Sequence, residues 1–64
     1  MSGEPADRVR NLLLRGDNQL KHGKPEKAVE AFEEALVAAG DESVDQRVRE
    51  LVERRLASAR ELAE

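Results

Sequence analysis

The chain has 64 residues, a net charge of −3 and no cysteine, which limits it to one small domain without disulfide bonds or thiolate-metal sites. Its single histidine, His22, argues against a structural zinc site, and its single aromatic residue, Phe32, argues against base stacking on nucleic acid. No apolar run approaches the roughly 20 residues of a membrane span, and no signal peptide is visible. We therefore expect a cytoplasmic protein with no membrane insertion, metal or cofactor.

The first helix is expected over residues 5–21, after a flexible leader at residues 1–4. Pro5 suits the first helical position, where an N–H group would have no partner, and the sequence from His22 to Lys24 ends the helix around Gly23. At about 100° per residue, one apolar stripe contains Val9, Leu12, Leu13, Gly16 and Leu20. Leu14 lies outside this stripe and is expected to be exposed.

The second helix is expected over residues 25–39. Pro25 opens it, Glu26 places a negative charge in the first turn, and Gly40 closes it. Its inner stripe consists of Ala28, Phe32, Ala35 and Ala39, widened by Val29, Ala31 and Leu36. Val37 points away from this stripe and is expected to be exposed.

The third helix is expected over residues 44–63. Ser43 followed by Gln46 matches a capping box. The apolar face consists of Val44, Val48, Leu51, Val52, Leu56, Ala59, Leu62 and Ala63. On the outside, the spacing predicts i,i+4 pairs of Asp45 with Arg49 and of Glu50 with Arg54.

Three amphipathic helices with short connections predict an all-α, antiparallel three-helix bundle that forms a single domain over residues 5–64. The net charge changes sign between the first and the second predicted helix. Residues 5–24 hold five basic against two acidic side chains, and residues 25–39 hold one basic against four acidic. The residues assigned to the core are Leu12, Gly16, Leu20, Ala28, Phe32, Ala35, Leu36, Val48 and Leu51.

Residues 9–40 resemble one tetratricopeptide repeat, most clearly in the segment GKPEKAVEAFEEAL. The matching positions are Leu12, Gly16, Leu20, Gly23, Ala28, Val29, Phe32, Ala35 and Leu36. The resemblance implies a closely packed helical hairpin, capped here by a third helix, that serves as a protein-binding module. Arg15 and Gln19 occupy positions that are usually apolar or aromatic in the family, and Gly40 replaces its terminal proline.

The segment RVRELVERRLASARELAE resembles the last helix of the microtubule-interacting and transport domain, whose three-helix plan the whole chain can follow. That resemblance implies a partner helix or extended segment in a groove beside the third helix. A tetratricopeptide clamp for acidic tails is not expected, because Leu13 and Asp17 stand where such clamps carry Lys and Asn.

The residues assigned to partner binding are Leu13, Leu14, Asp17, Val37, Val52, Arg55, Leu56 and Leu62. Leu14 and Val37 are expected to share one docking surface with the edge of the third helix. Arg55 falls within the apolar stripe, so its guanidinium either reaches the solvent edge or meets a carboxylate of the second helix or of a partner.

The first functional hypothesis is a non-enzymatic protein-interaction module that binds a partner helix, a peptide or a second copy through an apolar groove. A nucleic-acid-binding domain is the alternative, with Arg47, Arg54 and Arg55 on the third helix, although Glu50 and Glu53 interrupt that surface. A purely structural bundle, natural or designed, is a third interpretation. No catalytic triad or phosphate-binding glycine motif is present, so neither an enzyme nor a small-molecule substrate is expected.

Overall fold

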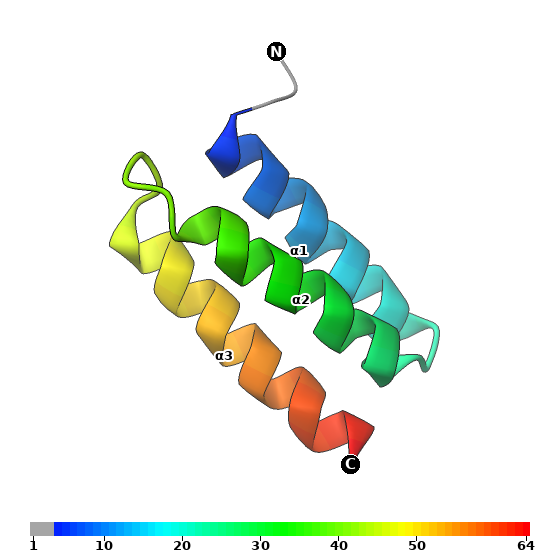
Figure 1. Ribbon diagram of the computed structural model, residues 1–64. Coiled ribbons are helices and arrows are strands. Elements are labelled where there is room, and N and C mark those ends of the chain that lie inside the picture. The colour runs from blue at the N-terminus through cyan, green and yellow to red at the C-terminus, as the bar shows by residue number, and fades with distance from the viewer. Residues whose placement is uncertain (1–3) are drawn as a thin grey trace.

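The computed structural model describes residues 4–64 and contains three α-helices, α1 (Pro5–Lys21), α2 (Pro25–Ala39) and α3 (Gln46–Ala63). The helices lie side by side with α2 in the middle (Figure 1). α2 packs along both neighbours, whereas α1 and α3 contact each other much less. The described residues contain no strand, which confirms the predicted all-α three-helix bundle. Residues 1–3 of the expected leader lie outside the described residues.

A glycine-dependent turn joins α1 to α2. Gly23 has a φ of +73°, in the left-handed region that glycine adopts without steric cost. Its N–H donates to the Leu20 carbonyl at 3.0 Å, and the Lys24 N–H donates to the Gln19 carbonyl at 2.8 Å. These two bonds form a Schellman motif. Pro25 then starts α2, so the chain reverses within three residues and α2 runs back along α1.

The connection from α2 to α3 differs from the prediction. α3 begins at Gln46, and its N-cap is Asp45, whose carboxylate accepts the Arg47 N–H at 2.8 Å. Ser43 instead donates its backbone N–H and its hydroxyl to Oδ1 of Asp41, at 2.9 and 2.7 Å. The capping box was therefore wrong, because Asp41 engages Ser43 and a better-placed carboxylate caps the helix two residues later. The two bonds from Ser43 lower the pKa of the Asp41 carboxyl, since they stabilise its charged form.

The predicted ion pairs on α3 were also wrong. Among residues 4–64, the structure forms ion pairs only between Arg55 and Asp17 and between Arg60 and Glu33. Arg49, expected to pair with Asp45, instead donates from Nε to the Ala39 carbonyl at 3.0 Å. Carbonyl groups at the end of a helix lack partners within it, so this bond satisfies the end of α2 and ties α3 to it.

The core consists of two adjoining clusters of buried residues. The first joins all three helices and contains Val9, Leu12, Ala35, Ala39, Val44 and Val52. The second lies mainly between α2 and α3 and contains Ala28, Phe32, Leu56 and Ala59. Leu13 and Leu36 pack against both clusters. Because four of these core residues are alanines, the backbones can approach closely.

α1 and α2 approach each other closely where Gly16 faces the ring of Phe32. A Cβ atom on Gly16 would lie 2.6 Å from Cζ of this ring, well inside van der Waals contact. Phe32 is completely buried, so its ring has no open space into which to move. The missing side chain at Gly16 is therefore what allows the ring to lie against α1.

Of the residues assigned to the core from the sequence, five are buried and three more are partly buried: Leu12, Gly16, Ala28, Phe32 and Ala35, then Leu20, Leu36 and Val48. Leu51 was wrongly assigned, because 39% of it is exposed. It lies one residue, or about 100°, away from Val52, which is fully buried at the centre of the stripe. No helix of residues 4–64 is long and apolar enough to cross a bilayer.

Candidate functional site

The side of the bundle where α1 and α3 face each other is hollowed into a groove of about 340 Å³. α1 contributes Leu13, Leu14 and Asp17 to its walls, and α3 contributes Val48, Leu51 and Arg55; Ala6, Val9 and Arg10 complete the lining. We call this feature the α1–α3 groove. It brings together four of the residues assigned to partner binding: Leu13, Leu14, Asp17 and Arg55.

α1 is buried on one side and exposed on the side that borders the groove. Val9, Leu12 and Gly16 are buried, whereas Leu14 points elsewhere around the helix and remains 57% exposed. Leu51 of α3 is the second exposed leucine of the lining. Two large apolar side chains thus stand on opposite walls, with Leu13 partly buried between them.

An ion pair crosses the groove between its two walls. The guanidinium Nη1 of Arg55 donates to Oδ2 of Asp17. The side chains are 38% and 43% exposed, respectively, so water reaches both. The expectation that a carboxylate partner of Arg55 would belong to α2 or to another molecule was wrong, because this carboxylate belongs to α1. α1 and α3 are thereby connected across the space between them.

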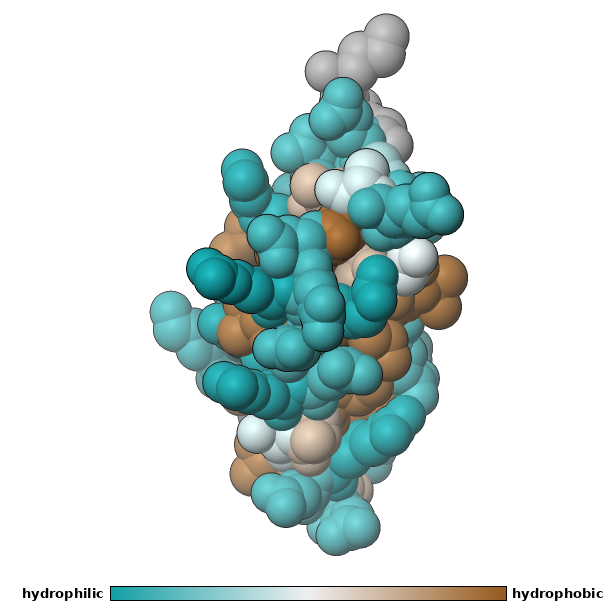
Figure 2. Space-filling model, turned by 90° about the vertical axis from the view of Figure 1, so that its left-hand side faces the viewer, coloured by the Kyte–Doolittle hydropathy of each residue, from teal (hydrophilic) through white to brown (hydrophobic). Residues whose placement is uncertain are grey.

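The remaining residues assigned to partner binding lie elsewhere. Val52 and Leu56 are 0% and 4% exposed, so both belong to the core and neither is accessible to a partner. Leu62 is 64% exposed near the end of α3, beyond the residues that line the groove. Figure 2 shows one side of the molecule, where hydrophilic residues predominate and hydrophobic side chains reach the surface in separate patches.

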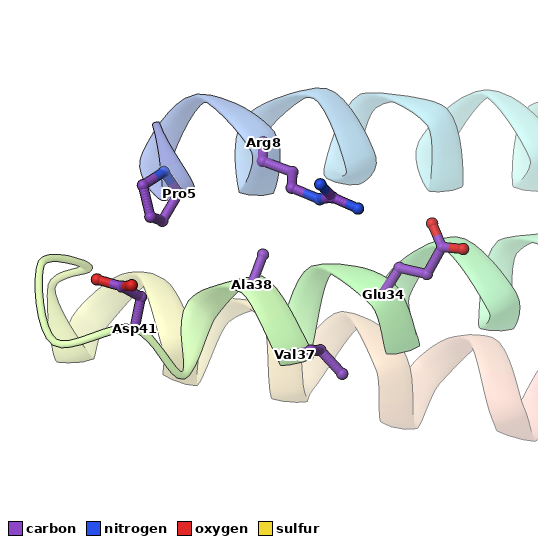
Figure 3. A pocket seen from close by; sticks show the side chains of 6 residues that line it. All are labelled: Pro5, Arg8, Glu34, Val37, Ala38 and Asp41. Carbon is purple, nitrogen blue, oxygen red and sulfur yellow. The ribbon is translucent and has the colours of Figure 1, made fainter. Parts of the chain in front are cut away.

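Val37 does not share a surface with Leu14, so the expectation of one docking surface was wrong. Val37 is 82% exposed and borders a different hollow, of about 520 Å³, between the start of α1 and the end of α2. In that hollow Arg8 extends from α1 toward Glu34 of α2, while Val37 points away from α1 (Figure 3). Its other lining residues include Asp41. The larger hollow thus carries charged side chains of both signs beside its apolar residues, whereas the smaller one contains the exposed side chains of Leu14 and Leu51.

Four cationic side chains surround the two exposed leucines of the groove. Arg10 precedes Leu14 by four residues and Lys21 follows it by seven; Arg47 precedes Leu51 by four residues and Arg54 follows it by three. Such spacings place residues on the same face of a helix. All four are exposed, and none takes part in the ion pairs of the described residues. Helical periodicity could have identified these four residues, but only the fold shows that Leu14 and Leu51, which they flank, line one groove. Of the four, Arg10 is itself part of the lining.

Residues that commonly bind metals do not cluster in the described part of the chain. No group of three or more His, Cys, Asp or Glu side chains in residues 4–64 could hold a metal ion. His22 is exposed in the turn after α1. The chemistry available at the α1–α3 groove is therefore apolar burial and charge pairing.

Compared with protein-family models, with curated proteins and with solved structures, the chain matches none of them. The three-helix architecture thus rests on the sequence and the structure themselves.

Proposed function

We propose that this chain is a non-enzymatic protein-interaction module that binds a helical segment in the α1–α3 groove. The supporting observation is the exposure of Leu14 and Leu51 on opposite walls of one groove. An amphipathic helix can bury such residues by inserting apolar side chains spaced at i, i+3/i+4 and i+7. The exposed leucines supply affinity, and the Asp17–Arg55 pair, which joins the two walls, restricts the orientation of the partner.

We also infer that α1 and α2 form a tetratricopeptide-like hairpin and that α3 occupies the place of the third helix in the microtubule-interacting and transport domain. Gly16 against the Phe32 ring, together with the fully buried Ala28 and Ala35, supports the first likeness. The position of α3 beside the hairpin, with a groove along it, supports the second.

The experiment is selection of peptides from a displayed library of amphipathic helices against the full chain. Enriched peptides are then tested against the double variant Leu14→Gln/Leu51→Gln, which removes the two apolar anchors without changing the charge. Val37→Gln is the matched control, because Val37 is more exposed than either leucine and lies outside the groove.

We expect at least tenfold weaker binding for the double variant, since losing two buried leucine contacts exceeds about 1.4 kcal/mol, and unchanged binding for Val37→Gln. Peptides that bind both variants equally well, or a library that yields no binder, would rule out the groove as the binding surface. Sedimentation equilibrium of the chain alone separates a foreign partner from a second copy, because only self-association raises the molar mass with concentration.

A further inference from the structure

The rim of the α1–α3 groove is positively charged although the chain as a whole is negative. Arg10 and Lys21 flank Leu14, and Arg47 and Arg54 flank Leu51. Against these four cations stands Asp7, which precedes Leu14 by seven residues and lies on the same face of α1. Of the four, Arg10 is part of the groove lining, and the other three lie beside it on the same helix faces. The acidic residue in the lining, Asp17, is paired with Arg55. The four flanking cations therefore face solvent beside the apolar floor without a carboxylate partner in the described residues.

The compensating negative charge lies on α2, away from the groove. Glu26, Glu30, Glu33 and Glu34 are all exposed on this helix, and none of them lines the groove. Of these, Glu33 is paired with Arg60 of α3. Charge is thus segregated: an excess of basic side chains borders the groove, and an excess of acidic ones covers α2.

We propose that the partner helix is acidic, with Asp or Glu on both sides of its apolar ridge. This inference rests on the proposed function and adds the charge of the partner to it. The exposed leucines of the groove would pack against the apolar side chains of the partner helix, and the four cations would pair with the carboxylates on either side of them. Such complementarity raises the association rate and makes binding weaker at high salt.

The same charges disfavour the two other occupants. In a two-fold dimer formed through the groove, the same surface of each copy faces the other, so the four cations would face their own copies, and like charges across an interface are costly. Nucleic acid would pair with the cations, but the floor between them is aliphatic, and the chain's one aromatic residue, Phe32, is fully buried and cannot stack on bases.

The test is a displayed helical library in which ridge positions are drawn from Leu, Ile, Met and Ala and flanking positions in equal shares from Glu, Gln and Lys. The target is the full chain, with Leu14→Gln/Leu51→Gln as counter-target. We expect the groove-dependent binders to be enriched in flanking Glu and to lose about tenfold or more in affinity between low and high salt.

A charge swap provides the matched pair of variants. Arg10→Glu/Arg54→Glu should shift the enrichment from Glu to Lys. Lys24→Glu/Lys27→Glu changes the net charge equally, but both residues line a separate hollow at the start of α2 and flank neither leucine of the groove. This control variant should leave the preference for Glu in place. Circular dichroism verifies that both double variants remain helical.

Four outcomes would overturn the inference. Groove-dependent binders with neutral or basic flanks would leave the proposed function standing and refute only the acidic partner. An absence of groove-dependent binders would refute both. A dimer that Leu14→Gln/Leu51→Gln dissociates would identify a second copy as the occupant. Binding of a 20-base-pair DNA duplex that Arg10→Glu/Arg54→Glu abolishes and that displaces the selected peptides would identify nucleic acid.

Discussion

α1 carries side chains of different size on the sides that face α2 and α3. It packs closely against α2, whereas a groove separates it from α3. Toward α2, α1 presents Gly16, and the Phe32 ring occupies the space where a Cβ would be. Toward α3, α1 presents Leu13 and Leu14, and a hollow of about 340 Å³ remains. A small residue thus lies at the close contact with α2, and large residues line the groove beside α3. The first contact is therefore expected to contribute to stability, and the second leaves apolar surface exposed, as the proposed binding function requires.

The largest expected effect is at the closed contact. Phe32→Ala removes a fully buried ring and should destabilise the fold by about 3 to 5 kcal/mol, which is comparable to the total stability of a domain this small. We expect the variant to lose its cooperative thermal transition in circular dichroism. Val37→Ala, an exposed position on the same helix, should keep it. A sharp transition in Phe32→Ala would place the core elsewhere.

Gly16→Ala tests the closeness of the same contact from the other side. The added methyl meets the Phe32 ring, so overpacking should cost about 1 to 3 kcal/mol, partly offset by up to about 1 kcal/mol from the better helix propensity of alanine. Urea unfolding should show a net loss. Combining the change with Phe32→Leu should recover part of this loss, because the two residues are coupled. A more stable Gly16→Ala variant would contradict the close approach.

The ion pair across the groove should contribute less. Asp17→Asn breaks its contact with Arg55, and pairs this accessible to solvent are typically worth about 0.2 to 1 kcal/mol. A double-mutant cycle with Arg55→Gln, measured by urea unfolding at low and high salt, isolates the coupling. We expect the coupling to shrink as salt is raised. A coupling that does not respond to salt would indicate that the pair is shielded from water and that the groove is closed.

The exposed leucines should matter least to folding. Leu14→Gln/Leu51→Gln should change the free energy of unfolding by no more than about 0.5 kcal/mol per site, as is usual for surface positions. The same urea titration measures it. Destabilisation on the scale expected for Phe32→Ala would show that these side chains belong to the core, and the distinction between closed contact and open groove would fail.

The connection that positions α3 should respond to pH in a defined direction. Hydrogen bonds from Ser43 lower the pKa of Asp41, so their contribution to stability is present above the unfolded-state pKa of the carboxyl and is lost as pH falls through the lower folded-state value. Ser43→Ala removes one of the two donors and should raise the pKa of Asp41 toward its ordinary range. NMR titration of the Asp41 carboxyl measures this shift, and an unchanged pKa would contradict the role of the hydroxyl.

The helix boundaries could be predicted from the sequence mainly because they are set by residues at the helix ends themselves. Pro5 and Pro25 each begin a helix, and Gly23 ends one through its left-handed backbone. The start of α3 was misplaced because Ser43 and Asp45 are both good capping residues, and only the bond from Ser43 to Asp41 decides between them. Competition between nearby side chains is not visible in a spacing pattern.

The groove could be predicted only in part. The helical pattern marked Leu14 and Val37 as exposed, and both are, but it could not tell which flank of α1 would face α3. The meeting of Asp17 with Arg55, 38 residues apart, depends on how α3 folds back along α2. Leu51 was misassigned because the apolar stripe of α3 was drawn too wide, and its centre lies at Val52, about 100° away around the helix.

The packing order along the chain has a kinetic consequence. Each helix packs mainly against the one that precedes or follows it, so most tertiary contacts join helices that are neighbours in the sequence. Chains with such local topology fold in microseconds to milliseconds, because little loop entropy is lost before contacts form. We therefore expect rapid folding from the α1–α2 hairpin outward, with α3 and its wall of the groove added last.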